Sequence, residues 1–500
     1  MQTIEPPISV ETVLSWGNEP APIPEALVTR PWIAVAENEL GRIEHNIQAL
    51  EGRRASLLHH ITAYRTVFAP HKRLPSEILR HIIILCVALQ PQPRLPGHGT
   101  LRVDLTKILR DRSDARFTLR QVCSKWRSII LGTHELWTDV HIYFGWRDRR
   151  ETRILLRLFQ TWLSLGGEHP LTLDVCIRGD YGDIGPVLFG CPHRLRSLTV
   201  SPLNAQCVQD LLAGRHGSMA HLEELTLDNS GSSTSLPTKH STIFLGSSHL
   251  RCTTLIGFSD EMLEPFGIPW AQLTQLNLEN SRISRTRLVS MLSLSLALTH
   301  ATLRITSNNL PDPESQVIIL PALHSLKLYS PELDSASKFL REMTLPELQE
   351  LALQCDDLSP ANIAPNPFPQ MRRFSIQLSS TAARKVPLPW LIACNTAEEV
   401  ILPHCVLGDA VPLISGGSLL PNLRILVVHS RDFRNMLPML KARLASRHHS
   451  TIAELGLDGT VGRIPFDRNV VDDLMKAGVF ICQGYLAWRD GYRGQVVLAL

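Results

Sequence analysis

The chain has 500 residues, of which 44% are apolar and 19% are charged. This composition excludes a mainly disordered protein and is sufficient for a large core. Fifty Lys and Arg residues against 47 Asp and Glu give a net charge of +3. Because no long block of one sign occurs, we expect neither a nucleic acid nor a membrane surface as partner.

Cysteine usage and the N-terminus indicate the compartment. Ten cysteines are scattered without a C-x-x-C pair, a pattern typical of reduced thiols in an intracellular protein. The first residues lack the basic start and apolar stretch of a signal peptide. The most apolar run, Ile82 to Leu89, is too short to span a bilayer. We therefore expect a soluble cytoplasmic or nuclear protein.

The N-terminal segment changes character near Pro31. Residues 1–31 contain six prolines and no sustained apolar period, which predicts a poorly ordered leader. Residues 32–68 carry a heptad pattern that predicts one long helix, roughly over 34–67. The stripe either forms a dimerising coiled coil or packs on the rest of its own chain, and an Arg at an a position costs a self-paired coil stability. Its a and d positions hold Leu40, Ile43, Ile47, Leu50, Arg54, Leu57, Ile61 and Tyr64.

Residues 70–142 contain two helical motifs. The first is Leu-Pro-Ser-Glu-Ile-Leu at 74–79, where a proline and an acid favour a helix start. The following run from Ile82 to Leu89 is apolar on every side, so one face needs a second cover, either a partner or the heptad helix. The second motif predicts one helix whose apolar face holds Leu119, Val122, Cys123, Trp126, Ile129 and Ile130. It is followed by Leu136-Trp137.

These motifs together resemble the F-box, the helical module that docks substrate receptors onto the Skp-type adaptor of cullin ubiquitin ligases. The long helix before them and the repeats after them are similar to the organisation of fungal F-box-like proteins. Leu74 and Trp126 are 52 residues apart, more than in a compact F-box, which indicates an inserted surface loop. The resemblance implies that the adaptor-binding or core residues are Leu74, Pro75, Ile78, Leu79, Ile82, Val122, Cys123 and Trp126.

The remainder, residues 150–500, repeats the pattern apolar-x-x-apolar-x-apolar. Its middle apolar position recurs every 23 to 29 residues from Leu198 to Leu455. A strand and a helix at this period resemble the leucine-rich repeat, which implies an α/β solenoid with parallel strands and with helices on the convex side. The position that usually holds a bonding Asn or Cys is instead occupied by Ser281, Pro331, Asp356 and Cys405. We therefore expect an irregular solenoid.

Strand alternation predicts which side chains lie on the concave face and could bind a target protein. The candidates are Thr226, Asn277, Lys327, Ala352, Ser375, Ile401, Val427 and Gly456. No phosphate-binding loop, nucleophile elbow or zinc-protease motif occurs, so we expect no cofactor, no metal and no enzymatic activity.

The leading hypothesis is a substrate-receptor subunit of a Skp-cullin-F-box ubiquitin ligase. It would bind the adaptor, and through it a cullin, by the F-box-like helices, and an unknown target by the repeats. The alternative is a leucine-rich-repeat scaffold without ligase function. In that case the F-box-like helices serve only as an N-terminal cap over the first repeat.

Overall fold

The computed structural model describes residues 5–15, 17, 23–68, 73–89, 103–104, 114–144, 149–177, 190–202, 219–230, 244–305, 317–357, 365–378, 384–403, 405–429, 439–440, 454–458, 476 and 480–483. The chain forms two compact units, Met1–Ile82 and Ile83–Leu500. Each unit is described separately below.

The first unit is dominated by a single helix of 45 residues, α2 (Ile23–Val67). It starts earlier than the predicted residue 34 and, with the short α1 (Val10–Ser15), lies partly inside the predicted leader. Pro31 sits within α2, although an interior proline removes one backbone hydrogen bond and costs about 3 kcal/mol. On the heptad stripe, Leu40, Leu50 and Tyr64 are exposed.

The helix α3 (Ser76–Ala88) contains the boundary between the two units. It begins one residue after Pro75, whose carbonyl accepts the Leu79 N–H at 3.1 Å. Glu77 lies in the first turn, near the positive end of the helix dipole.

The second helical motif forms two helices where the sequence predicts one. These are α5 (Ala115–Leu119) and α6 (Ser124–Gly132). The break lies at Cys123, which is extended (φ −163°, ψ 173°) and whose carbonyl accepts the Arg127 N–H to begin α6. The prediction of a single apolar face from Leu119 to Ile130 is therefore wrong.

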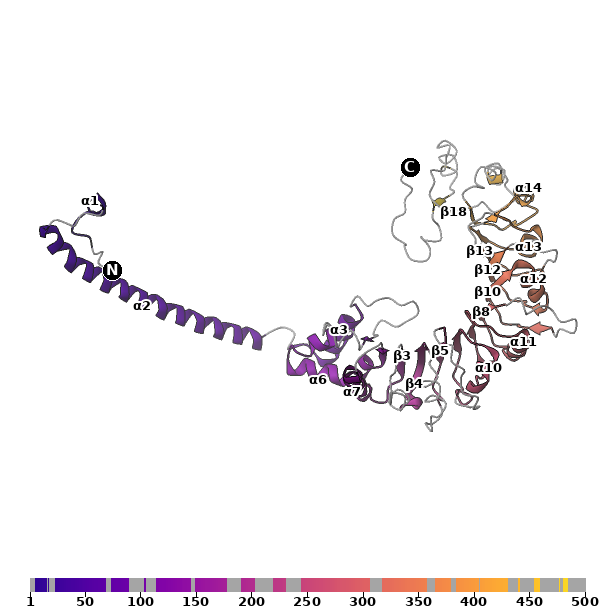
Figure 1. The fold of residues 1–500 in the computed structure, drawn as a ribbon, viewed down its shortest axis with the longest axis horizontal. Coiled ribbons are helices and arrows are strands. Elements are labelled where there is room, and N and C mark those ends of the chain that lie inside the picture. The colour runs from indigo at the N-terminus through magenta and orange to yellow at the C-terminus, as the bar shows by residue number, and fades with distance from the viewer. Residues whose placement is uncertain are drawn as a thin grey trace. The chain divides into compact units, whose positions relative to one another are not determined.

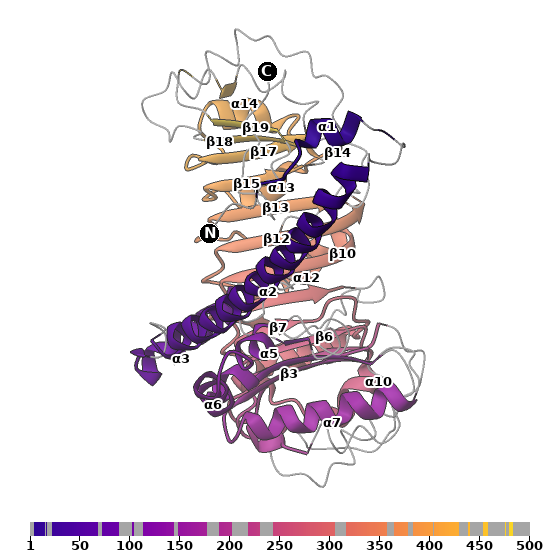
Figure 2. The ribbon, with the colours of Figure 1, turned by 90° about the vertical axis from the view of Figure 1, so that its left-hand side faces the viewer.

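The described part of the second unit contains one sheet of fifteen strands, all paired in parallel (Figures 1 and 2). The strands follow one another in chain order, as expected for a stack of repeats. They are β1 (Val103–Asp104), β2 (Asp139–Phe144), β3 (Leu171–Ile177), β4 (Leu195–Ser201), β5 (Glu224–Asp228), β6 (Cys252–Ile256), β7 (Gln275–Asn277), β8 (His300–Arg304), β10 (Ser325–Glu332), β12 (Glu350–Asp357), β13 (Arg373–Leu378), β15 (Glu399–Leu402), β17 (Ile425–His429), β18 (Glu454–Asp458) and β19 (Phe480–Gln483).

Helices and short turns link these strands, because parallel strands require a crossover rather than a hairpin. Figure 1 shows α10 to α14 along one side of the sheet. Two small parallel pairs, β9 (Ile318–Ile319) with β11 (Met343–Thr344) and β14 (Arg384–Lys385) with β16 (Cys405–Val406), complete the crossovers. The linking helices are α7 (Arg149–Leu165), α10 (Asp260–Leu263), α11 (Arg285–Leu294), α12 (Leu333–Arg341), α13 (Leu388–Ala393) and α14 (Ala410–Ser415), with the 3₁₀ turns η2 (His134–Trp137), η3 (Pro192–Arg194), η4 (Glu264–Phe266) and η5 (Trp270–Gln272).

The repeating apolar position forms the spine of the core. From Leu198 in β4 to Leu455 in β18, the residues at this position pair in register across successive strands. Their side chains are buried. The prediction of an α/β architecture with parallel strands is confirmed. The sheet begins with β1 and β2, however, which precede the predicted domain boundary at residue 150.

Eight successive strands, from β6 to β17, start with the same main-chain arrangement. The carbonyl just before one strand accepts two N–H groups, from the residue just before the next strand and from that strand's first residue, at 2.7–3.1 Å. The accepting residues are Glu223, Arg251, Thr274, Thr299, His324, Gln349, Arg372 and Glu398. These bonds fix the spacing of neighbouring strands without using a side chain.

At the other end of the strands, two buried side chains bond the next or previous repeat. Ser281 Oγ donates to the Leu255 carbonyl at 2.9 Å and accepts the Phe258 N–H at 3.1 Å. Asn229 Nδ2 donates to the Gly257 carbonyl at 3.3 Å. Gly257 has a φ of +74°, and a Cβ there would lie 3.0 Å from the Ser230 nitrogen. The close approach of two repeats therefore requires a glycine.

Candidate binding surfaces

The four predicted target-binding residues lie in one row across the sheet. Thr226 in β5, Asn277 in β7, Lys327 in β10 and Ser375 in β13 occupy the same register position, with Thr254, Thr302 and Ala352 between them. Lys327 is exposed and the other three are half-buried. Strand alternation thus identified a real row of accessible side chains.

The same row is covered at two of its later positions. Ile401 and Val427 continue the register from Ser375, but their side chains are only 4% and 0% exposed. In β15 the three successive residues Val400, Ile401 and Leu402 are all buried, so both faces of the sheet are covered there. The prediction that Ile401 and Val427 are accessible is therefore wrong.

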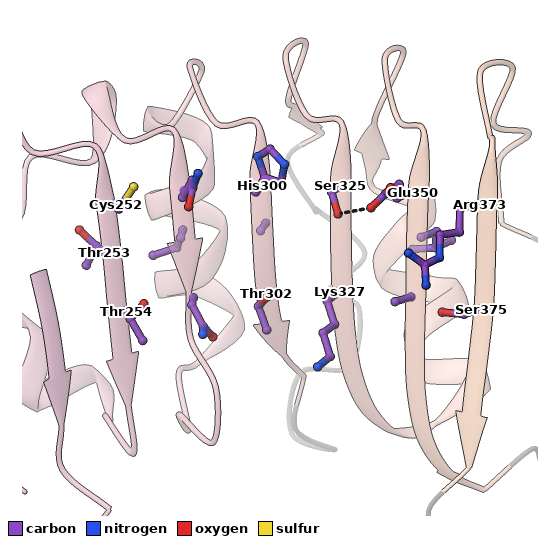
Figure 3. Close-up of a pocket in the computed structure, with 16 residues that line it drawn as sticks. Cys252, Thr253, Thr254, His300, Thr302, Ser325, Lys327, Glu350, Arg373 and Ser375 are labelled. Atoms are coloured by element: carbon purple, nitrogen blue, oxygen red, sulfur yellow. Dashed lines mark hydrogen bonds between the residues drawn. The ribbon is translucent and has the colours of Figure 1, made fainter. Parts of the chain in front are cut away.

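A second row, which the sequence analysis missed, lies two residues earlier on each strand. The two rows together line an open hollow of about 450 Å³ on the face of β6 to β13 (Figure 3). The same period-2 rule that selected the first row also selects the second, because residues i and i+2 share a face. The second row consists of Cys252, Gln275, His300, Ser325, Glu350 and Arg373.

Charges in and beside the hollow are paired with neighbours. Ser325 Oγ donates to the Glu350 carboxylate at 3.3 Å, the bond drawn in Figure 3. Arg373 lies 3.5 Å from a carboxylate oxygen of Glu399 on the next strand, and Lys327 Nζ lies 4.8 Å from the centre of the Tyr329 ring. The hollow therefore presents both signs of charge, hydroxyls and an amide, a mixture suited to hydrogen bonding with a polypeptide.

The chemistry of Cys252 does not favour a nucleophile. Burial, with smaller contributions from Glu224 and Glu223, raises the pKa of this thiol above its ordinary value. The protonated thiol is the less reactive form. Among the described residues, no group of three His, Cys, Asp or Glu side chains is arranged to hold a metal ion.

A second surface lies on α3, which carries apolar residues on two faces. Leu79, Ile83 and Val87 are fully buried. The α3 stripe, defined here as Ile78, Ile82, Leu85 and Leu89, is spaced 4, 3 and 4 residues apart and therefore lies along one side of the helix. Ile78, Leu85 and Leu89 are 49%, 53% and 81% exposed, and Ile82 is half-buried.

The remaining predicted F-box residues are divided between core and surface. Leu74 is half-buried and Pro75 exposed, and Cys123 is half-buried at the start of α6. Trp126 is half-buried and packs against the core of the second unit. Val122 is 49% exposed because it lies in the break between α5 and α6, not on a continuous helical face with Trp126.

Two buried groups that the sequence analysis missed stabilise α5 and α6. Asp114 caps α5, accepting the Arg116 N–H at 2.8 Å, and its other oxygen accepts from the Arg116 guanidinium at 2.7 Å. Burial lowers the pKa of Arg116, and Asp114 opposes that shift. Trp137 Nε1 donates to the Ile130 carbonyl at 3.0 Å, and its ring packs edge-on against Trp162, with 4.6 Å between ring centres.

No helix in the described part of the chain has the length and apolar character needed to cross a bilayer. The assignment of both surfaces rests on their geometry alone: no protein-family model matches the chain, and the comparison with curated proteins found no match.

Proposed function

We propose that this chain is a substrate-receptor subunit of a Skp-cullin-F-box type ubiquitin ligase. In this proposal the helices of residues 70–142 dock the adaptor, which links the chain to a cullin. The sheet face of the repeats binds a target protein. Other subunits of the complex carry out the catalysis.

The observation that carries the proposal is the α3 stripe. The buried face of α3 is sufficient to pack the helix on the core, so the exposed stripe does not contribute to folding. An exposed apolar stripe of this kind is typical of a docking surface. Complete burial of one Leu or Ile side chain is worth about 1.5–3 kcal/mol. The three most exposed residues of the stripe can therefore supply several kcal/mol of binding free energy.

The repeat region supports the other half of the proposal. We interpret the strand-and-helix stack as a degenerate leucine-rich repeat, in which Ser281 and Asn229 do the bonding that a regular asparagine ladder does elsewhere. The two rows around Lys327 lie on the accessible face of the sheet. Stacked repeats commonly recognise proteins on such an extended surface.

A specific observation favours the scaffold alternative. Ile83, Val87 and Ile130 belong to the same continuous core as the repeats, and β2 pairs directly with β3. The F-box-like helices thus share the core of the repeats, as a capping unit would. Capping explains the buried face of α3 but gives no role to the exposed α3 stripe.

Co-expression with a Skp-type adaptor tests the proposal. Wild-type protein is expected to co-purify with the adaptor, and Leu85→Asp is expected to weaken binding at least about tenfold, or about 1.4 kcal/mol. Ser76→Asp adds the same charge at an exposed position on the opposite side of the same helix; it is the matched control and should bind normally. Circular dichroism must show that both variants fold. If wild type binds no adaptor, or if both variants bind it equally well, the ligase proposal is wrong and the scaffold alternative remains.

A further inference from the structure

We propose that α2 pairs with the α2 helix of a second copy of this chain in an antiparallel coiled coil. The proposal rests on the exposed heptad seam and on the distribution of charge along the helix. It is independent of the ligase proposal.

The seam is longer than the part identified from the sequence. Its a and d positions run from Ile33 to Phe68, about five heptads and about 54 Å of helix, whereas three to four heptads already indicate a coiled coil. Its larger apolar side chains are 46–66% exposed, apart from the half-buried Ile43. The exposed members are Ile33, Leu40, Ile47, Leu50, Leu57, Ile61, Tyr64 and Phe68.

A lone helix of this composition depends on packing for its stability. Gly41 and Gly52 lie inside α2 with open space around them, and each costs about 1 kcal/mol relative to Ala. Pro31 adds a further cost. Helices in proteins gain most of their stability from burying an apolar face, and the seam is the face that α2 has available.

Charge along α2 selects the orientation of the partner. The e and g positions in the first half of the seam hold Glu37, Glu39 and Glu44, whereas the second half carries Arg53, Arg54 and Arg65 with the single acid Glu51. Arg42 of the first half is bound to Glu39 on its own helix at 2.6 Å, so these two charges offset each other and Glu37 and Glu44 leave this half acidic. An antiparallel pair places the acidic half of each helix beside the basic half of the other.

A parallel pair has the opposite electrostatics. It sets Glu39 at a g position beside Glu44 at an e position of the other helix, and it places two Arg54 side chains in the same layer of the seam. In an antiparallel pair each a position faces a d position of the other helix. The two Arg54 side chains therefore lie in different layers of the seam. Both features favour the antiparallel arrangement of two identical chains.

Sedimentation of the full-length protein over a concentration series tests the pairing. Wild type is expected to show a monomer–dimer equilibrium. Ile47→Asp, which places a charge in the seam, is expected to weaken dimerisation at least about 100-fold. Gln48→Asp adds the same charge at an exposed position outside the seam and should dimerise like wild type. A wild-type monomer at every concentration, or equal dimerisation by the two variants, overturns the proposal.

Charge reversal tests the orientation. Glu37→Arg with Glu44→Arg makes both halves basic, so self-association should weaken at least tenfold in an antiparallel pair. In a parallel pair the same change removes the repulsion between positions 39 and 44, and self-association should not weaken. Mixing this variant with Arg53→Glu plus Arg65→Glu should restore association as a heterodimer. Undiminished self-association of the first double variant overturns the antiparallel assignment.

Discussion

Replacement of Trp137 tests how α6 is held against the elements that pack beside it. The side chain is 1% exposed, its ring packs against Trp162, and its indole N–H bonds the Ile130 carbonyl at the end of α6. Truncation of a buried Trp to Ala costs about 3–5 kcal/mol. We therefore expect Trp137→Ala to loosen α6 and β2.

Trp137→Phe separates packing from hydrogen bonding. The Ile130 carbonyl also accepts the Thr133 N–H at 3.2 Å, so loss of the indole does not leave this carbonyl unpaired. The hydrogen bond itself is then worth only about 1 kcal/mol. We expect the Phe variant to cost a small part of what the Ala variant costs.

Native-state hydrogen exchange is the suitable assay, because a stack of repeats need not unfold in one step and local opening is what the substitution changes. Amides of α6 and β2 should exchange about 100- to 1000-fold faster in Trp137→Ala and about tenfold faster in Trp137→Phe, since tenfold corresponds to about 1.4 kcal/mol. Amides of β18, far along the stack, should be unchanged and serve as the internal control. Equal effects of the two substitutions, or unchanged exchange in α6, would refute this account of Trp137.

Three further predictions concern separate features. Asp114→Ala should destabilise α5 by up to about 3–5 kcal/mol because it removes the carboxylate that bonds the buried Arg116 guanidinium at 2.7 Å, and adding Arg116→Met should recover part of the loss in thermal melts. Gly52→Ala should raise the helix content and thermal stability of α2 by about 1 kcal/mol, measured by circular dichroism; a loss of stability would show that the position is packed. Burial raises the pKa of Cys355 and Cys405 to about 12, whereas an unfolded Cys ionises near ~8.5. The contribution of these protonated thiols to the free energy of unfolding is therefore complete below about pH 8.5 and is lost as the pH rises toward 12. Urea unfolding of Cys355→Ala should show a smaller loss of stability at alkaline pH than wild type. An identical loss would contradict the raised pKa of Cys355.

The sheet could be predicted because its signal repeats. One position, from Leu198 to Leu455, is buried in every strand. Because the pattern recurs, a single irregular repeat does not hide the period. The row through Lys327 followed from the same rule. Ile401 and Val427 differ because alternation fixes which way a side chain points but not whether something covers it.

The N-terminal helices were harder to predict because each occurs once. The apolar spacing from Leu119 to Ile130 fits a continuous helix, and only the extended backbone at Cys123 reveals the break. The Asp114–Arg116 ion pair has no periodic sequence pattern. It matters to the fold because it is buried and because Arg116 lies over the ring of Trp162. The helix α2 begins before the predicted residue 34 because it continues through Pro31, a residue type that in sequence favours a helix boundary.

The paired N–H groups at the strand starts have a consequence for how this chain can change over generations. The carbonyls that accept them are main-chain groups of residues with side chains as different as those of Glu223, Thr274, His324 and Arg372. Selection for the stack therefore places little demand on the identity of these residues. A lineage can exchange them, or duplicate a whole unit between two existing ones, while the spacing of neighbouring strands is inherited intact.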